Sequence, residues 1–547
     1  MPFLTKLKKV VGNLTYHPQQ ERDEFYIPKY PDHDDRKPKP KKDEKISSKI
    51  EDNLLYMQQA FCADKNNDIV IRQFSLSNGR KAFIVYIDGM VKSTTINEFI
   101  LKPLFLEPIS EEEDLQKKIQ SIVQINALKP TELYAEAIDA VLIGDTTICI
   151  DGLSQMFTGE TKGFDKRSVG KPQNESTIKG AQEAFNESIR TNTTLIRRIV
   201  KSKDLVTEFM KIGQINNNFC GVMYINGLAN PAIVAEVKRR IESIKSDFLF
   251  GSGMLEQFIE DGPFRIFPNI LSTERPDTVA MHLCQGRVAV VVDGTPFALV
   301  MPIGIANMIK SVEDSSLRWQ YSTVLRFTRI VSIIMSVLLP GFFVAIVNYH
   351  RGMIPTELLV AIAKSRESVP FPTVLEVLIM EFSFELIREA GVRVPGVIGN
   401  TIGIVGGLIL GQAAVTANLV SPVMIIIIAF TGIANFAIPD FSFAFGVRIL
   451  RFLFIVLAGM LGFVGLGLGM VVVIAFITTQ KSFGVGVLAP IAPKTVTKAN
   501  LVLSPPEWKK ELRPDELNPS KKDNQPKISR RWILKKTPKS NDKGAQK

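Results

Sequence analysis

The sequence predicts an α/β cytoplasmic domain of two duplicated subdomains, followed by an α-helical membrane domain with about four spans and an interfacial or re-entrant helix. Two observations predict this architecture. Charged residues recur every few positions from Lys42 to Arg329, whereas no Asp, Glu, Lys or Arg occurs from Val394 to Pro439. Within the charged part, two kinds of segment each occur twice.

The N-terminal residues 1–45 end in "DDRKPKPKKDEK". Such a charged, proline-rich stretch cannot bury enough apolar surface to fold alone, so we expect a disordered charged N-terminus. It contains no apolar segment of signal-peptide length, which predicts that the domain after it stays in the cytoplasm. A helix is then predicted in "SSKIEDNLLYMQQAF", with Ser48 as its N-cap and Glu51 three residues later.

The internal repeat defines the α/β part. "AFIVYIDGMVKSTTINEFILKPL" (82–104) resembles "CGVMYINGLANPAIVAEVKRRI" (220–241), and each predicts a buried strand, a turn and a helix. "DAVLIGDTTICIDGL" (139–153) resembles "VAMHLCQGRVAVVVDGT" (279–295), and each predicts a hairpin that ends in Asp-Gly. A duplication of one α/β unit explains why both pairs have nearly the same spacing.

These patterns divide the chain into six regions. They are the disordered charged N-terminus (1–45), α/β subdomain 1 (46–160), a helical linker (161–204), α/β subdomain 2 (205–320), the membrane domain (325–490) and a basic disordered tail (491–547). Residues 494–547 hold 15 Lys and Arg against 6 Asp and Glu. After membrane spans, this excess favours anionic membrane lipid as the partner over nucleic acid, and a merely solvated tail is the alternative.

No enzyme is predicted. Asp88, Asp151 and Asp293 all follow predicted strands, but Asp-Gly pairs supply turn geometry, and no His or Ser partner recurs at matching offsets. The four histidines have no metal-ligand spacing, the four cysteines form no Cys-x-x-Cys pair, and no nucleotide-binding glycine motif follows a strand. We therefore expect no catalytic, cofactor or metal site.

Four segments are long and apolar enough to span a hydrocarbon core of about 30 Å. They are Ile330–Tyr349, Val397–Val420, Val423–Ile438 and Phe452–Ile477. An even number of spans leaves both ends of the membrane domain on the cytoplasmic side. The Lys and Arg residues between the first two spans are more numerous than an external loop usually carries, so the topology there is open.

The connection between the first two spans contains "FPTVLEVLIMEFSFELIREAG". On a helix, its charged residues Glu381, Glu385, Arg388 and Glu389 fall on one side. This segment is too interrupted to span and is predicted to lie at the interface or to re-enter. An acidic stripe near a pore mouth would concentrate cations; an interfacial helix with its charges in water is the alternative.

The second span has two unlike sides. On a helix, one stripe carries the predicted pore-lining residues Thr401, Val405, Leu408, Gln412 and Thr416. The other side carries small residues predicted to pack helices, namely Gly399, Gly403, Gly406, Gly407 and Gly411. Polar groups within a membrane face a protein interior or a water-filled path, which predicts an oligomeric pore with Val405 and Leu408 as a hydrophobic constriction. A helix buried on all sides is the alternative.

Six motifs together resemble the A subunit of the GerA family of bacterial spore germinant receptors. They are "FNESIRTNTTLIRR" (185–198), "TERPDTVAMHLCQGRVAVVVDGTPF" (273–297), "HRGMIPTELL" (350–359), "SRESVPFPTVLEVLIMEFSFELIREAGVRVPGVIGN" (365–400), "IVGGLILGQAAV" (404–415) and "SFGVGVLAP" (482–490). The resemblance runs from about residue 50 to 493. It implies a homo-oligomeric, nutrient-gated ion channel for spore germination in the spore inner membrane, with a transporter-like B subunit and a lipoprotein C subunit.

The resemblance also bears on single residues. Pro370 and Pro372 match the family's P-F-P element, which implies a link between the cytoplasmic side and the pore. Gln285-Gly286 stands where the family usually has Glu-Gly, and Ser315-Ser316 stands where it has a tyrosine pair. Two alternatives stay open: a family paralogue associated with the dipicolinate release channel, and a solute carrier.

Overall fold

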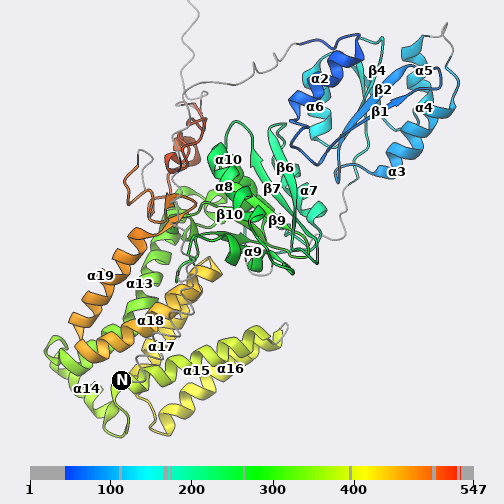
Figure 1. Cartoon of the computed structure of the whole chain (residues 1–547). Coiled ribbons are helices and arrows are strands. Elements are labelled where there is room, and N and C mark those ends of the chain that lie inside the picture. Colours follow the sequence, from blue (N-terminus) through cyan, green and yellow to red (C-terminus); the bar gives the residue numbers. More distant parts are fainter. Residues whose placement is uncertain are drawn as a thin grey trace, which may run out of the picture.

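The structure, a computed structural model, describes residues 27, 44–109, 114–163, 170–172, 175, 177–262, 265–393, 397–495, 501–526 and 530, with side chains for all of these except 392, 393, 397–405 and 408. Two α/β subdomains and a helical region follow one another along the molecule (Figure 1). The predicted disordered N-terminus, residues 1–45, lies almost wholly outside the described residues.

Subdomain 1 is a five-stranded antiparallel sheet with helices on both faces. The strand order is β1–β2–β4–β5–β3. Side chains alternate between the faces, so that Phe83 and Val85 enter one core and Ala82 and Ile84 the other. The strands are β1 (Ile69–Ser75), β2 (Lys81–Ile87), β3 (Leu128–Thr131), β4 (Thr146–Ile150) and β5 (Met156–Gly159). One face carries α2 (Ile50–Ala60) and α6 (Tyr134–Leu142); the other carries α3 (Ser93–Thr95), the π-helical η1 (Ile96–Leu101), α4 (Lys102–Leu106) and α5 (Leu115–Ile122).

Subdomain 2 has the corresponding strand order, β6–β7–β9–β10–β8. Its strands are β6 (Leu205–Ile212), β7 (Asn218–Ile225), β8 (Leu271–Thr273), β9 (Val288–Val292) and β10 (Ala298–Met301). One face carries α7 (Ile189–Ile199) and α10 (Pro276–Cys284), the other α8 (Pro231–Glu242) and α9 (Ser252–Ile259), and α11 (Ile305–Met308) and α12 (Glu313–Ser316) follow. The matching order is what the repeat predicts, while an origin by duplication stays a prediction.

The paired Asp-Gly turns cap helices. Asp151 Oδ1 accepts a hydrogen bond from the Ile50 amide at the start of α2 (3.2 Å), and Asp293 Oδ1 accepts one from the Ile189 amide at the start of α7 (2.9 Å). The glycine after each aspartate has a left-handed φ, of 87° and 84°. The prediction that Ser48 caps the first helix is wrong, because the N-cap position is Lys49 and the acceptor comes from Asp151.

The two predicted hairpins are also corrected. Residues 139–142 and 279–284 are helical and form the last parts of α6 and α10, so each segment is a helix followed by a strand. Gly144 and Gly286, with φ of 96° and 95°, end these helices instead of turning hairpins. Short apolar runs fit a buried strand and a buried helix equally well, which is why the pattern was ambiguous.

The region predicted as a helical linker, 161–204, has one helix among its described residues, α7, which belongs to the core of subdomain 2. A buried ion pair joins the subdomains: Arg197 Nη2 donates to Asp68 Oδ1 at 2.7 Å, and both side chains are at most 2% exposed. The Asn67 amide donates to the Thr207 carbonyl at 2.9 Å, so a loop of subdomain 1 covers the edge strand β6.

The helical region follows subdomain 2. Its elements are α13 (Trp319–Tyr349), the 3-10 turn η2 (Arg351–Met353), α14 (Thr356–Arg366), α15 (Thr373–Arg393), α16 (Val397–Thr416), α17 (Pro422–Phe436), α18 (Phe441–Leu461), α19 (Phe463–Thr479) and the two-stranded β11 (Lys481–Ser482) and β12 (Val485–Gly486). Among the described residues, α13 and α18 are long and apolar enough to cross a membrane, and α17 and α19 are shorter apolar helices. The number of spans stays a prediction.

The predicted fourth span, Phe452–Ile477, is not one helix. It breaks at Gly462, whose φ is +62°, and α18 and α19 pack against each other on either side of this residue. Close packing depends on a second glycine, because a Cβ at Gly465 would lie 2.1 Å from the Leu457 carbonyl oxygen. Periodicity could not reveal this turn, since both arms are uniformly apolar.

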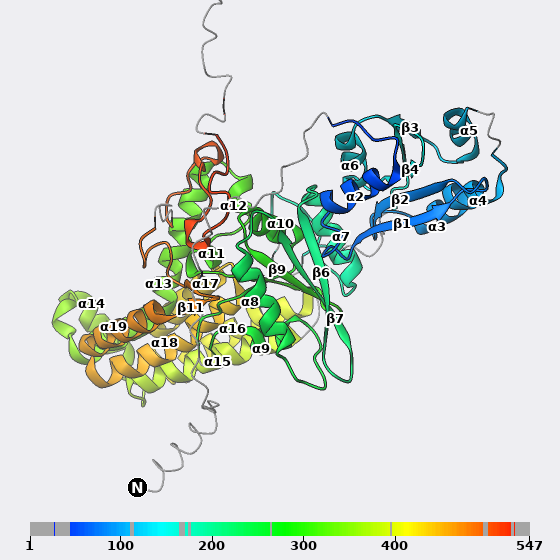
Figure 2. The same cartoon turned by 45° about the horizontal axis from the view of Figure 1, so that its top comes forward.

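The C-terminal segment packs on subdomain 2, at the end of the helical region that lies nearest this subdomain (Figure 2). The Ser520 amide donates to the Leu228 carbonyl at 3.3 Å, and Asn230 Nδ2 donates to the Asn518 carbonyl at 3.2 Å. Leu517 is 1% exposed and packs in a small apolar cluster. The prediction of a disordered tail from 491 onward is therefore wrong for 501–526, which include the 3-10 turns η3 (Glu507–Lys509) and η4 (Asp515–Leu517).

Candidate pore helix and charge junction

The candidate pore helix is α16, which packs beside α15 as the second arm of a helical hairpin (Figure 1). Gln412 and Thr416 are exposed, and Thr416 Oγ1 donates to the Gln412 carbonyl oxygen at 2.8 Å. The side chains of Thr401, Val405 and Leu408 lie outside the described residues. Both described residues of the predicted polar stripe are therefore exposed in the single chain.

The glycine side of α16 meets helices of the same chain. A Cβ at Gly406 would lie 3.8 Å from Ile387 of α15, and a Cβ at Gly411 would lie 3.6 Å from Ile425 of α17. Gly407 has no atom within 4 Å of that position. Gly399 and Gly403 fall among the residues whose side-chain environment is not described. Where it is described, this side mainly packs within the chain.

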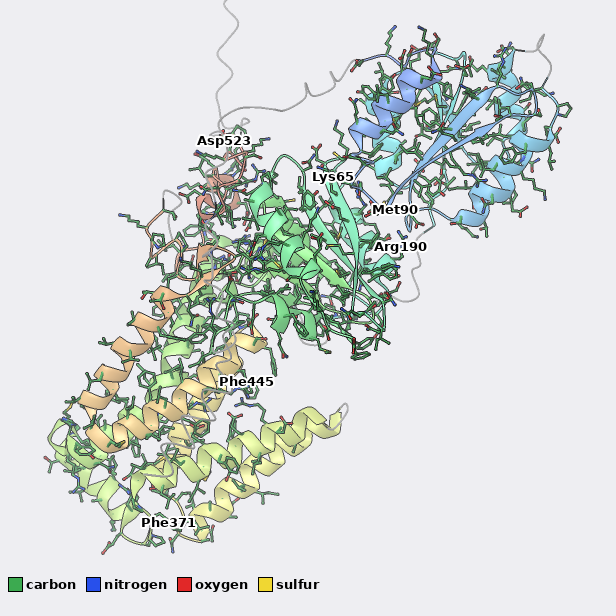
Figure 3. All side chains as sticks on the ribbon, viewed as in Figure 1. Lys65, Met90, Arg190, Phe371, Phe445 and Asp523 are labelled. Carbon is green, nitrogen blue, oxygen red and sulfur yellow. The ribbon has the colours of Figure 1, made fainter. Side chains whose placement is uncertain are left out.

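The P-F-P element lies between α14 and α15. Phe371, between Pro370 and Pro372, is at the end of the helical region far from the two sheets, whereas Phe445 is near subdomain 2 (Figure 3). Just after it, Thr373 Oγ1 donates to Asn348 Oδ1 near the end of α13 at 2.8 Å. The P-F-P element thus lies at the end of the helical region opposite subdomain 2, and its role in linking the cytoplasmic side to the pore stays a prediction.

The charges of α15 are paired with arginines of α18. Arg451 Nη1 donates to Glu381 Oε2, and both side chains are 0% exposed. Arg448 Nη1 donates to Glu385 Oε2 at 3.1 Å, and Arg388 Nη1 lies 3.4 Å from the same oxygen. We call these five residues the charge junction.

The charge junction bears on the two interpretations of α15, an acidic stripe at a pore mouth and an interfacial helix with its charges in water. An interfacial helix with its charges in water does not fit Glu381 and Arg388, because their side chains are only 0% and 12% exposed. Glu389, in contrast, is exposed. A role of these residues at a pore mouth stays a prediction.

The start of α18 is fixed to subdomain 2. Asp440 Oδ1 accepts from the Phe443 amide at 2.6 Å and caps the helix. The rings of Phe443 and Phe267 stack with centroids 4.9 Å apart. A Cβ at Gly446 would lie 2.6 Å from the Ile266 carbonyl oxygen, so glycine is required for this contact. The junction thus connects α15 to a helix held by the sheet domain.

Comparison with known proteins settles the family. Residues 56–516 match the family model described as Bacillus/Clostridium GerA spore germination protein. The chain belongs to the GerA family. It is 38% identical to spore germination protein KA of Bacillus subtilis (strain 168), over 85% of this chain and 86% of that protein. It is also 38% identical to the uncharacterized membrane protein YfkQ of the same strain, over 86% and 92%.

Among solved structures, a similar one covers about half of this GerA-family chain. It is the crystal structure of the N-terminal domain of the A subunit of the Bacillus megaterium spore germinant receptor GerK3, which is 32% identical, with a TM-score of 0.39, over 48% of this chain and 98% of that chain. The GerA match is to a spore germination family and not to an enzyme family.

The 273–297 motif of this GerA-family chain anchors the preceding linker. Arg275 is 2% exposed, and its Nη1 donates to the Glu175 carbonyl at 2.9 Å while its Nη2 donates to the Ala181 carbonyl at 3.1 Å. The Glu175 carboxyl accepts from Thr273 Oγ1 at 2.9 Å. Burial raises the pKa of Glu175 to about 7, although the hydrogen bonds that its carboxyl accepts from Thr273 Oγ1 and from the Glu274 amide lower it.

Sequence reasoning missed the partners on α18. Arg448 and Arg451 are about one helical turn apart and directly precede the predicted fourth span, Phe452–Ile477. Glu381 and Glu385 on α15 are likewise about one helical turn apart, at a spacing of four residues against three for the arginines. Two arginines in an apolar segment signal a need for buried carboxylates. Glu376 was also missed: it is 0% exposed and accepts from the Ser421 amide at 2.6 Å.

Proposed function

We propose that this chain is the A subunit of a nutrient germinant receptor, and that it oligomerises as a nutrient-gated ion channel in the spore inner membrane. A transporter-like B subunit and a lipoprotein C subunit complete the complex, and neither nucleic acid nor a cofactor takes part. Family membership supports the receptor role, and the apolar helices α13 and α18 support a membrane location.

The observation that carries the channel role is the exposed polar side of α16. This helix has no charge, and the described glycines at 406 and 411 face α15 and α17. Gln412 and Thr416 are left exposed in a single chain. Polar groups seldom face lipid, so a second subunit or a water path should cover them, and a ring of subunits supplies both.

Within that ring, the stripe Thr401, Val405, Leu408, Gln412 and Thr416 would line the conduit. Val405 and Leu408 would close it by excluding water. The charge junction would hold α15, and hence α16, to α18 and subdomain 2. A change in subdomain 2 could then reach the pore helix through α18.

Cysteine modification tests this proposal. The receptor with all three subunits is reconstituted in vesicles, and Gln412→Cys is compared with Ala413→Cys, its exposed neighbour off the polar stripe. A charged, water-borne thiol reagent should react with position 412 and reduce nutrient-triggered cation efflux at least severalfold, while modification at 413 leaves efflux unchanged. Equal effects at both positions, or no reaction at 412, would refute a pore along this stripe.

The oligomer is tested separately. The native mass of the detergent-extracted chain, alone and with its partner subunits, should correspond to a homo-oligomer of ring size. A stable single copy under conditions that preserve nutrient-triggered efflux would refute the homo-oligomeric channel.

A further inference from the structure

Large apolar side chains are exposed together at one end of subdomain 2. We call them the α9 surface; it consists of Ile215, Phe219, Phe248, Phe250, Met254 and Phe258, which are between 37% and 74% exposed. Exposed apolar side chains scattered singly are ordinary, whereas a contiguous group usually marks a contact with a protein or a membrane.

These side chains come from three adjoining segments. The Ile215 amide in the β6–β7 turn donates to the Asp247 carbonyl at 2.8 Å, which brings this turn beside the loop before α9. In that loop the rings of Phe248 and Phe250 stack with centroids 6.3 Å apart. Phe250 also covers the β9–β10 turn, where a Cβ at Gly294 would lie 2.6 Å from its ring. The surface is therefore continuous from the β6–β7 turn to α9.

Helix α9 has apolar residues on two sides. Leu255 and Ile259 are 0% exposed and enter the core of subdomain 2. Met254 and Phe258, four residues apart and hence on one face, are 37% and 51% exposed. The inner side explains why α9 packs on the sheet. The apolar side chains on the outer side are exposed, and their burial against another apolar partner would be favourable.

The α9 surface lies beside the point where α18 leaves subdomain 2. Burial, together with the neighbouring carboxylates of Glu260 and Asp440, raises the pKa of Glu256 on α9 to about 7, and Asp440 is the N-cap of α18. Figures 1 and 2 both show α9 at the end of subdomain 2 nearest the helical region. The first turns of α18 expose Phe441 and Phe445, at 69% and 53%.

We propose that the α9 surface rests in the headgroup region of the lipid bilayer that the helices cross. Helices that lie at this depth carry Phe, Leu or Trp on the face that is buried among the upper acyl carbons. Exposed Lys211, with Nζ 5.8 Å from the Phe219 ring centre, and exposed Lys245 flank the surface and favour anionic lipid.

The α9 surface lies next to the membrane helices, and this favours lipid over a second protein as the partner that covers it. Subdomain 2 is already held at the start of α18 by the Phe267–Phe443 stack and the close contact at Gly446. A surface of this kind next to the first turn of a membrane helix reaches the bilayer without any rearrangement. The surface then acts as a second attachment that fixes the orientation of subdomain 2 relative to the membrane. This role holds whether or not the chain conducts ions.

Fluorescence quenching by lipids tests the proposal on the full chain in lipid nanodiscs containing anionic phospholipid. A polarity-sensitive label is placed at Phe258→Cys, after Cys62→Ser and Cys284→Ser have removed the two thiols that are not buried. A second label at Phe248→Cys repeats the measurement. Phe99→Cys is the matched control, because Phe99 is 44% exposed in subdomain 1, far from the helical region (Figure 1).

We expect nitroxide-bearing lipid to quench the labels at positions 258 and 248 at least twofold more than the label at 99. A nitroxide at a shallow acyl position should quench more than a deep one, and aqueous iodide should quench 258 and 248 less than 99. Iodide quenching equal at all three positions would show that the surface is in water and would overturn the proposal. Protection from iodide without quenching by lipid would mean that protein, such as a second copy of the chain, covers the surface, and it would overturn the proposal as well.

Discussion

Removing Arg451 alone is expected to destabilise the helical region more than removing both members of its ion pair. Arg451→Met leaves the carboxylate of Glu381, which is 0% exposed, without its partner. Breaking a buried pair in this way costs about 3–5 kcal/mol of unfolding free energy, whereas replacing both charges by apolar groups is often neutral. The double substitution Glu381→Met with Arg451→Met should therefore recover most of the stability.

The second single substitution is expected to cost less. In Glu381→Met, Arg451 keeps a neighbouring carboxylate, because its Nη2 lies 4.0 Å from Glu385 Oε1. The double-mutant cycle should then give a coupling of about 2 kcal/mol or more between the two side chains, within the range for residues of one buried network.

Detergent-induced unfolding of the full chain in mixed micelles, followed by helical circular dichroism, measures these differences. Glu389→Gln on the same helix is the matched control, because Glu389 is exposed; its effect should stay within about 0.5 kcal/mol. Single losses that simply add in the double variant would refute the pairing of α15 with α18. So would a loss below about 1 kcal/mol for Arg451→Met, because a buried unpaired carboxylate cannot be that cheap.

Three further predictions concern single contacts. Gly446→Ala should lower stability by about 1–3 kcal/mol in the same unfolding assay, because its Cβ meets backbone, whereas Gly467→Ala in α19 has open space and should be neutral or stabilising. Asp293→Ala and Asp151→Ala should each cost about 1 kcal/mol by removing a helix cap, and hydrogen exchange should rise only in the first turn of the helix concerned. Because the folded pKa of Glu175 is raised, its contribution to stability is full below the unfolded value of about 4.5 and is lost as the pH rises through about 7. Glu175→Gln should reduce the change of the thermal unfolding midpoint between pH 5 and 8. A pH dependence of the midpoint equal to that of the unmodified chain would contradict a protonated Glu175.

The strand–turn–helix units could be predicted because their signals are local. β2 and β7 are runs of buried residues that end in tight turns. The Asp-Gly turns need a glycine with a left-handed φ whatever the rest of the chain packs against. The segments before Gly144 and Gly286 failed for the same local reason, since four apolar residues fit either a strand or a helix. Only the contacts of α6 and α10 with their sheets decide between the two.

The candidate site was predictable in part. The two sides of α16 follow from helical periodicity, but exposure does not separate them: Ala413, off the polar stripe, is exposed like Gln412, and Gly407 meets no atom within 4 Å. The assignment of one side to the pore and the other to packing stays a prediction. The charge junction could not be predicted, because α15 and α18 are far apart in the sequence and nothing local pairs Glu381 with Arg451. The turn at Gly462 was hidden for another reason: apolar residues on both sides gave no change of pattern.

The covered edge of the second sheet has a practical consequence for work with fragments. Without the loop containing Asn67, the outer edge of β6 would have unpaired backbone groups. In the full chain the Asn67 amide donates to the Thr207 carbonyl, and the Asn67 side chain accepts from the Phe209 amide. Bare strand edges recruit other chains and favour aggregation. A truncated protein that begins after subdomain 1 would also strand the Arg197 guanidinium without Asp68. Soluble fragments should therefore keep the two subdomains together, and insolubility of the shorter fragment would say nothing about the function of the full chain.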